Sequence, residues 1–305
     1  MTGAPAAVGV RIREVGPRDG LQVEAPVPVA ARVRLVDALV AAGVRSVEAA
    51  AFVSPKAVPA MAGAAELMAA LAARGEEGVT YAVLVPNAVG AERATFCHEV
   101  TFTLSASPAY NERNVRMSID RSVEEAAAAV EVLARRDVPV DAVVSCAFGS
   151  PFEGDIDPGG VHALGRRLLA VGVASLTYAD TTGMATPRRI RELLDVTGPD
   201  IGLHLHDTRG TALLNAHTAF ELGVRRFDTA VGGLGGSPAT RGVGGVTGGN
   251  LATEDLVHLF DDLGVPTGID IDRLLDASRL AAGLVGHEVP SRVAAAGPRG
   301  RLAPA

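Results

Sequence analysis

The chain has 305 residues, of which 48% are hydrophobic and 21% charged, with 28 basic and 35 acidic residues and a formal net charge of -7. This composition excludes a disordered or fibrous protein, and charges interspersed without a Lys/Arg block make nucleic acid a poor partner. Because the longest uncharged stretches, 142–152 and 229–240, fall short of the roughly 18 residues of a membrane span and the N-terminus lacks a secretory pattern, we expect no membrane partner and a cytoplasmic location.

Short β-rich segments alternate with alanine-rich amphipathic segments along the chain. The predicted strands are 10–15, 46–52, 79–85, 99–106, 140–148, 175–180, 201–207 and 225–231. The predicted helices are 29–42, 59–74, 88–97, 122–136, 159–171, 187–196, 211–222 and 252–263. Eight such pairs predict an α/β fold, a (β/α)8 TIM barrel. The rival open doubly wound sheet would have a Gly-rich turn after its first strand, where this sequence has GPRDGLQ.

The C-terminal region extends this barrel. A further helix is predicted at 270–283, so the catalytic barrel domain is predicted to span 8–285. Residues 286–305, rich in Ala, Pro, Gly and Arg, are predicted to form a partly disordered C-terminal tail. The two cysteines, Cys97 and Cys146, are too few for a disulfide framework or a structural zinc site, and both are expected to be buried apolar side chains.

Polar side chains occur at the ends of several predicted strands, where barrels of this kind place their active sites. After the first strand, Arg18 would bring a fixed positive charge to an enolate or carboxylate oxygen, or would form a surface ion pair. Glu48, in the second strand, would hold Arg18 in a bidentate pair, or would cap a helix or form a salt bridge at the barrel mouth. Because Thr186 is the better N-cap, Asp180 is left free for the site.

Two histidines lie two residues apart in the seventh predicted strand. The side chains of His204 and His206 therefore point to the same face, which suits a metal ligand pair or two satisfied core histidines. Asp19 and Asn250, which follow the first and eighth strands, would complete a mixed oxygen and nitrogen shell suited to Mg²⁺ or Mn²⁺. Asp207 faces the other way and is expected to orient a ligand or cap the next helix.

The segment from residue 232 to residue 250 is rich in glycine and follows the eighth predicted strand. Its flexibility favours a lid, or a loop that closely approaches a substrate, and a plain linker is the alternative. Ser237, which precedes a proline, is the candidate hydroxyl group of this loop.

Several of these segments together resemble hydroxymethylglutaryl-CoA lyase, a family of the metal-dependent lyase and Claisen-condensing barrels. The resemblance runs in order from about residue 10 to about residue 285. It is carried by VGPRDGLQVE (15–24), SVEAAAFVSPKAVPAMA (46–62), SASPAYNERN (105–114), ADTTGMATP (179–187), HLHDTRGTALLN (204–215), VGGLGGSP (231–238) and GNLATEDLV (249–257).

The resemblance implies cleavage of 3-hydroxy-3-methylglutaryl-CoA to acetyl-CoA and acetoacetate. It implies an acyl-CoA partner, and we also expect a homo-oligomer, either a dimer or a tetramer. In the implied site, Arg18 neutralises the acetyl-CoA enolate, Glu48 positions Arg18, and Asp180 transfers a proton. The implied cofactor is a divalent ion, Mg²⁺ or Mn²⁺, bound by Asp19, His204, His206 and Asn250.

One position departs from the family pattern. Where the family has a catalytic cysteine before a proline, this chain has Ser237, and the loop from there to Asn250 is about four residues longer. A hydroxyl is a much weaker acid than a thiol. The departure leaves open a lyase acting on a 3-hydroxyacyl-CoA with a different C3 substituent, a Claisen-condensing acyltransferase of the same barrel group, and a weakly active CoA-thioester-binding protein.

Overall fold

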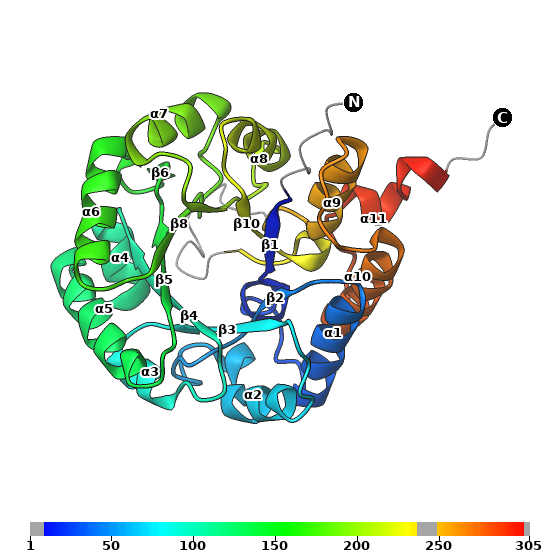
Figure 1. The fold of residues 1–305 in the computed structure, drawn as a ribbon, viewed down its shortest axis with the longest axis horizontal. Coiled ribbons are helices and arrows are strands. Elements are labelled where there is room, and N and C mark those ends of the chain that lie inside the picture. Colours follow the sequence, from blue (N-terminus) through cyan, green and yellow to red (C-terminus); the bar gives the residue numbers. More distant parts are fainter. Residues whose placement is uncertain (1–8, 237–248, 302–305) are drawn as a thin grey trace, which may run out of the picture.

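Eight parallel strands close into a barrel in the order β1-β10-β9-β8-β5-β4-β3-β2 in the computed structural model, which describes residues 9–236 and 249–301 (Figure 1). This confirms the predicted (β/α)8 TIM barrel. The barrel strands are β1 (Arg11–Glu14), β2 (Ser46–Ala51), β3 (Thr80–Val85), β4 (Glu99–Ser105), β5 (Val140–Ser145), β8 (Ser175–Ala179), β9 (Gly202–His204) and β10 (Arg226–Thr229).

Helices surround the barrel and cover the outer face of the strands (Figure 1). In the longer helices, side chains three and four residues apart bury one face, as Ile190, Leu193 and Leu194 do in α7. The helices are α1 (Val29–Ala41), α2 (Ala64–Ala72), α3 (Ala88–Arg93), α4 (Pro108–Val115), α5 (Ile119–Ala134), α6 (Pro158–Ala170), α7 (Pro187–Thr197), α8 (Ala212–Glu221), α9 (Thr253–Asp262), α10 (Ile271–Val285) and α11 (Arg292–Ala296).

Successive side chains of the strands point alternately to an apolar outer face and to a polar barrel interior. In β4, Val100, Phe102 and Leu104 are almost fully buried core residues. Thr101 lies between them and contacts Arg13 of β1 at 3.5 Å, which places both of these polar side chains inside the barrel. The barrel interior therefore holds charged and hydroxyl side chains, while the apolar core lies between the strands and the helices.

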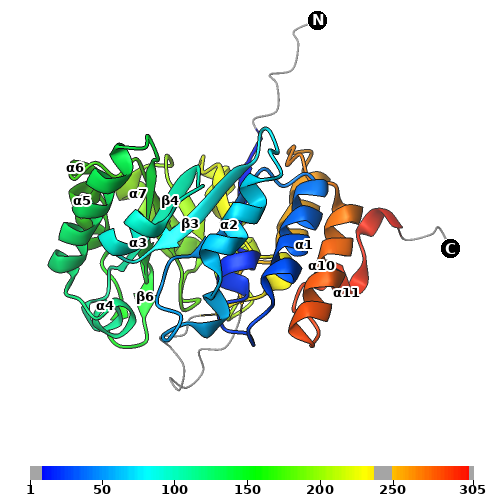
Figure 2. The ribbon, with the colours of Figure 1, turned by 90° about the horizontal axis from the view of Figure 1, so that it is seen from below.

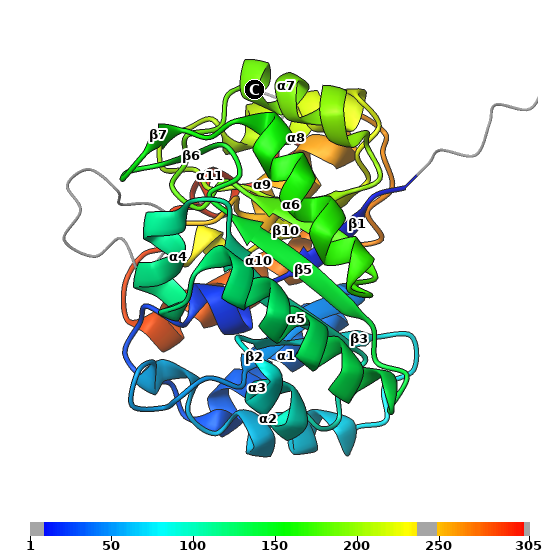
Figure 3. The same ribbon diagram turned by 90° about the vertical axis from the view of Figure 1, so that its left-hand side faces the viewer.

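Two elements at the carboxyl end of the barrel were not predicted. Helix α4 follows β4, and a short hairpin formed by β6 (Gly149–Ser150) and β7 (Gly154–Asp155) follows β5. Both lie at the same end of the barrel (Figure 3). The predicted helix at 59–74 is also interrupted: a 3-10 turn, Pro59–Met61, is separated from α2 by Gly63, whose φ of 76° favours glycine.

The C-terminal helices pack on the barrel beside the first unit. Helix α10 lies next to α1 (Figure 2), and α11 packs against α9. The described part of the predicted tail, 286–301, thus contains a helix, whose N-cap Ser291 donates a hydrogen bond to Asp255 at 2.8 Å. Residues 302–305 lie outside the described residues.

Candidate active site

A cavity of about 290 Å³ opens at the carboxyl ends of the strands. Its polar wall includes half of the residues predicted for the site, and other lining side chains come from β3, β4, β5 and α4. The lining residues include Arg18, Asp19, His204 and His206, together with Val58, Leu84, Thr103, Tyr110, Val143 and Gly236. The predicted convergence on one face of the barrel is confirmed for Arg18, Asp19, His204 and His206, while Glu48 and Asp180 do not line the cavity.

A tight helical turn presents Arg18 and Asp19. Directly after β1, the residues Gly16–Gly20 form one turn of π-helix with proline in its first turn. Glycine at position 16 leaves room for its neighbours, because a Cβ atom there would lie 2.6 Å from Oε1 of Glu14 and 2.8 Å from Cγ1 of Val231 and would displace those side chains. The same Oε1 accepts a hydrogen bond from the Gly16 amide at 2.7 Å, which fixes the start of the turn.

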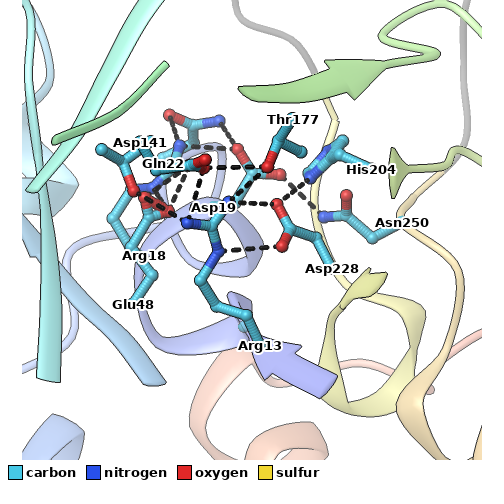
Figure 4. Close-up of polar contacts among 12 residues, drawn as sticks. Arg13, Arg18, Asp19, Gln22, Glu48, Asp141, Thr177, His204, Asp228 and Asn250 are labelled. Carbon is cyan, nitrogen blue, oxygen red and sulfur yellow. Dashed lines mark hydrogen bonds and ion pairs between the residues drawn. The ribbon is translucent and has the colours of Figure 1, made fainter. Parts of the chain in front are cut away.

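Arg18 forms a buried ion pair with Glu48 (Figure 4). Its Nε and Nη2 atoms donate to Oε2 of Glu48 at 2.9 and 2.6 Å, and its Nη1 atom donates to Asp19 at 2.7 Å. Burial alone would raise the pKa of Asp19, but the charges of Arg18 and the two histidines, with the hydrogen bond from Asn250, together outweigh it and lower that pKa below its ordinary value. The predicted pairing of Glu48 with Arg18 is thus present, and it is buried, with 1% of Glu48 and 8% of Arg18 exposed.

The histidine pair faces the cavity together with Asp19. Nε2 of His204 lies 3.1 Å from Nε2 of His206. One ligand atom from each histidine and from Asp19 lies within 4.8 Å of the others, so the three residues form a candidate metal site. The sequence predicted this arrangement, because residues two apart in a strand share a face.

Asn250 completes this cluster from the far end of the glycine-rich segment. Its Nδ2 atom donates to Asp19 at 2.7 Å and to the Leu234 carbonyl at 2.9 Å. Its Oδ1 atom is buried and has no hydrogen-bond partner within the described residues. A buried amide oxygen without a hydrogen-bond partner costs the folded protein free energy. An electropositive group beside the Oδ1 atom of Asn250 would recover that free energy.

The glycine-rich segment approaches this cluster closely. Gly235 has a φ of 118°, and a Cβ atom there would lie 2.4 Å from Nδ2 of Asn250. Only glycine therefore lets the backbone pass so near the candidate metal site, and Gly236 lines the cavity. Ser237 lies outside the described residues, which resume at Gly249.

Asp180 occupies a different environment from the other predicted residues. Ala179 and Thr181 line the cavity, whereas Asp180 between them does not. Its Oδ1 atom accepts hydrogen bonds from the amides of Met184 and Ala185 at 2.6 and 2.9 Å, while its buried Oδ2 atom has no partner in the described chain. Burial raises the pKa of Asp180 to about 7.

Thr186 is the N-cap of α7, as predicted, and Asp207 bonds the first amide of α8, whose N-cap is Thr211. The hydroxyl of Thr186 accepts a hydrogen bond from the Arg189 amide at 3.3 Å at the start of α7. Asp207 accepts one from the Ala212 amide at 3.0 Å at the start of α8. Asp207 is thus used to stabilise a helix rather than to face the histidine side of the strand.

The cysteines lie outside the histidine cluster. Both are free thiols, with Cys146 buried and Cys97 half-buried. Burial raises the pKa of Cys146 to about 12, so its thiol is a poor acid at neutral pH.

Several residues near the cavity were not predicted. Asp228 lines the cavity, and Arg13 contacts it from inside the barrel. The sequence carried a signal for both: Arg13 and Asp228 each lie in the middle of a predicted strand, and a charge in a buried strand requires a partner. Arg113 and Asn114 line the cavity from α4, and the Arg113 guanidinium lies 5.7 Å from the centre of the Phe152 ring.

Comparisons with known proteins find similarity over nearly the whole chain. The family model described as HMGL-like matches residues 9–281. A 3-hydroxy-3-isohexenylglutaryl-CoA/hydroxy-methylglutaryl-CoA lyase from Pseudomonas aeruginosa is 40% identical over 295 residues, which cover 94% of this chain and 96% of that protein. An (R)-citramalyl-CoA lyase from Chloroflexus aurantiacus is 39% identical over 306 residues, which cover 95% of each.

Solved structures agree with the sequence comparisons. An HMG-CoA lyase from Acinetobacter baumannii, in complex with coenzyme A and 3-methylmalate, superposes with a TM-score of 0.88 at 39% identity and covers 97% of both chains. An HMG-CoA lyase from Bacillus subtilis superposes with the same TM-score at 34% identity, covering 96% of this chain and 99% of that one. Within the described residues, every helix is too short or too polar to cross a membrane.

Proposed function

The chain belongs to the HMGL-like family, as its motifs predicted, and on that premise we propose that it cleaves 3-hydroxy-3-methylglutaryl-CoA, or a related 3-hydroxyacyl-CoA. The products are acetyl-CoA and a 3-oxo acid such as acetoacetate. The protein is an enzyme of the lyase class, like the relatives that match almost all of its length. The observation that carries the proposal is one cavity lined both by Arg18, which is held in a buried pair with Glu48, and by the cluster of Asp19 with two histidines.

We infer that this cluster holds a divalent ion. The fit rests on the proximity of its three ligand atoms, on the unpartnered Oδ1 atom of Asn250, and on a donor set without thiolate that suits Mg²⁺ or Mn²⁺. When bound, the ion supplies Lewis-acid polarisation of the substrate's hydroxyl and carbonyl oxygens. The residues that would hold it are Asp19, His204, His206 and Asn250.

The reaction breaks the bond between C2 and C3 of the acyl chain. A base removes the proton of the C3 hydroxyl, and C3 becomes the carbonyl carbon of the 3-oxo acid. The electron pair of the broken bond passes to the thioester as an enolate, and a proton added to C2 then gives acetyl-CoA. Arg18 would neutralise the enolate oxygen, because Glu48 and Asp19 fix its guanidinium at the cavity wall before the charge develops.

Two residues enter the proposal as proton-transfer groups. Asp180 is proposed for its unpartnered Oδ2 atom and its pKa of about 7, which allows it to accept or donate near neutral pH. Ser237 is proposed from its place in the loop that begins beside Gly236 of the cavity wall. A serine hydroxyl passes a proton on from water or a neighbouring group instead of acting as an independent acid.

The acyl-CoA would enter past α4. This helix contributes Arg113 and Asn114 to the lining of the cavity. We further propose a homo-oligomer, a dimer or a tetramer, which light scattering of the purified protein tests directly.

An assay of the purified protein tests the function. With Mg²⁺ or Mn²⁺ present, we expect hydroxymethylglutaryl-CoA or a relative such as citramalyl-CoA or 3-hydroxy-3-isohexenylglutaryl-CoA to release a short acyl-CoA and an oxo acid in equal amounts. The last two thioesters belong in the panel because similar lyases carry their names. Condensation of acetyl-CoA with a 2-oxo acid, or tight thioester binding without cleavage, would replace the lyase proposal.

A further inference from the structure

A buried ionic cluster lies inside the barrel next to the candidate metal site (Figure 4). Its centre is Arg13 of β1, whose side chain is 8% exposed. The Nε and Nη2 atoms of Arg13 donate to the two carboxylate oxygens of Asp228 at 2.8 and 2.9 Å. Its Nη1 atom donates to Asp141 at 2.9 Å and to Glu99 at 3.0 Å. Every guanidinium nitrogen therefore has a carboxylate partner, and Asp228 forms the bidentate pair.

Asp228 also contacts one of the proposed metal ligands. Its Oδ2 atom lies 3.3 Å from Nδ1 of His204, on the side of the ring opposite the Nε2 atom that approaches His206. An ionised carboxylate can only accept a hydrogen bond, so this contact favours the tautomer with the proton on Nδ1. The lone pair of His204 is then on Nε2, which faces the cavity.

The backbone register keeps these side chains in one row. Arg13 is the partner of Asp228 between β1 and β10, and Asp228 is the partner of His204 between β10 and β9. Partners in neighbouring parallel strands point to the same face, which here is the barrel interior. The row therefore runs through β10, the strand that joins β1 to β9 in the barrel.

We propose that Asp228 and Arg13 are positioning residues for the metal centre. Asp228 fixes the tautomer and the ring orientation of His204, and Arg13 fixes the carboxylate of Asp228. The inference rests on the metal site of the proposed function. Charge balance alone does not account for the arrangement, because Arg13 already has Asp141 and Glu99 as partners, whereas Asp228 is the carboxylate among them that reaches the histidine.

Mn²⁺ binding without substrate tests the inference, measured from the electron paramagnetic resonance signal of the free ion. Asp228→Asn should weaken Mn²⁺ binding by about 10- to 100-fold, the usual cost of losing such a partner of a metal-bound histidine. The reason is that an amide presents one oxygen and one NH₂ group where Asp228 now accepts hydrogen bonds from three nitrogen donors. Arg13→Met should weaken binding in the same direction.

Arg11→Met is the matched control. Arg11 lies two residues earlier on the same strand and, within the described chain, bonds Glu99 and Ser46 at 3.2 and 3.3 Å but neither Asp228 nor His204. Its Mn²⁺ affinity should stay within about twofold of the wild type, because Arg11 bonds neither His204 nor the carboxylate of Asp228 that orients it. Equal weakening in the Arg11 and Arg13 variants would overturn the assignment.

A second readout separates positioning from a general loss of stability. In the Co²⁺ form, the visible absorption bands report the ligand geometry, and Asp228→Asn should shift them. If Arg13→Met fails to fold because it leaves buried carboxylates unpaired, Asp228→Asn still decides, since Arg13 retains Asp141 and Glu99 there. A folded Asp228→Asn protein with wild-type Mn²⁺ affinity and Co²⁺ spectrum would overturn the inference.

The wild-type protein separates this inference from the proposed function. A wild type that binds Mn²⁺ but cleaves no thioester removes only the proposed substrate, and the comparison of affinities still decides the inference. A wild type that binds neither Mn²⁺ nor Co²⁺ removes the proposed metal site and the inference together.

Discussion

Arg18 is buried between two carboxylates, which makes it part of the fold as well as of the proposed chemistry. The sequence left open a surface ion pair for this residue, and its 8% exposure excludes that reading. Removing one member of a buried ion pair leaves the other charge uncompensated. A loss of activity on mutation must therefore be separated from a loss of stability.

Arg18→Gln should lower kcat by about 100- to 1000-fold, the usual cost of removing a charge-stabilising donor. It should also lower the melting temperature, because Glu48 would remain 1% exposed without its partner. Steady-state kinetics and calorimetry measure the two effects. The double variant Arg18→Gln/Glu48→Gln should recover much of the melting temperature and none of the activity. Recovery of activity in the double variant would show that Arg18 acts only through the fold.

Ser237→Cys tests the departure of the loop from its family. A thiol ionises near 8.5 and is easily tuned lower, so it should deliver a proton to the enolate faster than a serine hydroxyl. We expect the variant to raise turnover of hydroxymethylglutaryl-CoA and Ser237→Ala to cost little. A large loss with alanine and no gain with cysteine would indicate a serine-based relay and a different substrate.

At the scale of elements, helix α4 depends on the hairpin formed by β6 and β7. The hydroxyl of Ser107 accepts from the Tyr110 amide at 3.0 Å and caps the helix. Glu153, between the two hairpin strands, accepts from the Ser107 hydroxyl at 2.5 Å and from the Ala109 amide at 2.9 Å. A negative charge at a helix N-terminus also interacts favourably with the helix dipole. The hairpin therefore sets the position of the helix that lines the cavity.

Glu153→Ala should raise KM for the acyl-CoA several-fold with little change in kcat, because it loosens α4 and leaves the histidine cluster untouched. The lost cap interaction should lower stability by about 1 kcal/mol. Kinetics over a range of thioester concentrations and a urea titration measure both. Glu124→Ala is the control, since Glu124 is 66% exposed in a surface pair with Arg121. An unchanged KM in the Glu153 variant would contradict this role of the hairpin.

The sequence predicted the eight strand and helix pairs because each carries its own pattern of apolar residues. Helix α4 escaped this approach because PAYNERNV lacks an apolar stripe, and its stability comes from Ser107 and from Glu153 in a separate element. His204 and His206 were predictable from their spacing alone. Asp228 was not, because its importance depends on the register of β10 with β1, which local periodicity does not encode.

At the scale of the whole molecule, barrel closure brings the two ends of the sequence into one site. Asp19 and Asn250 are 231 residues apart and bonded at 2.7 Å. Asp19 follows β1 and Asn250 follows β10 in the sequence, and these two strands pair with each other in the barrel. An ion held by these residues, by His204 of β9 and by His206 just after it would therefore join the first and last parts of the barrel, and its binding should stabilise the entire fold.

Metal removal should accordingly lower both activity and thermal stability. An ion at 100 times its Kd adds about 2.7 kcal/mol to the free energy of unfolding. We expect a chelator to abolish turnover and lower the melting temperature, and Mg²⁺ or Mn²⁺ to restore both. The turnover and melting temperature of the His206→Gln variant should change neither with chelator nor with added metal. A wild type whose melting temperature and turnover ignore chelator and metal would remove the metal site.

The stability of the metal-free barrel should also fall as the pH rises above neutrality. Burial raises the pKa of Glu14 to about 7 and that of Glu254 to about 8, from an ordinary value of 4.5. A carboxyl whose pKa is raised in the folded state binds more protons there than in the unfolded chain. Its stabilising contribution is therefore complete below about pH 4.5 and is lost as the pH rises through the folded value.

Urea titrations of the chelated protein from about pH 7 to 8.5 measure the part of this loss that Glu254 contributes, since unfolded histidines are mostly neutral above about pH 7. Each group contributes at most about 1.4 kcal/mol per pH unit. Glu254→Gln should flatten the profile, because its amide can accept the Gly232 hydrogen bond, now 2.8 Å long, without a titratable proton. A profile as steep in the variant as in the wild type would show that Glu254 does not titrate in this range.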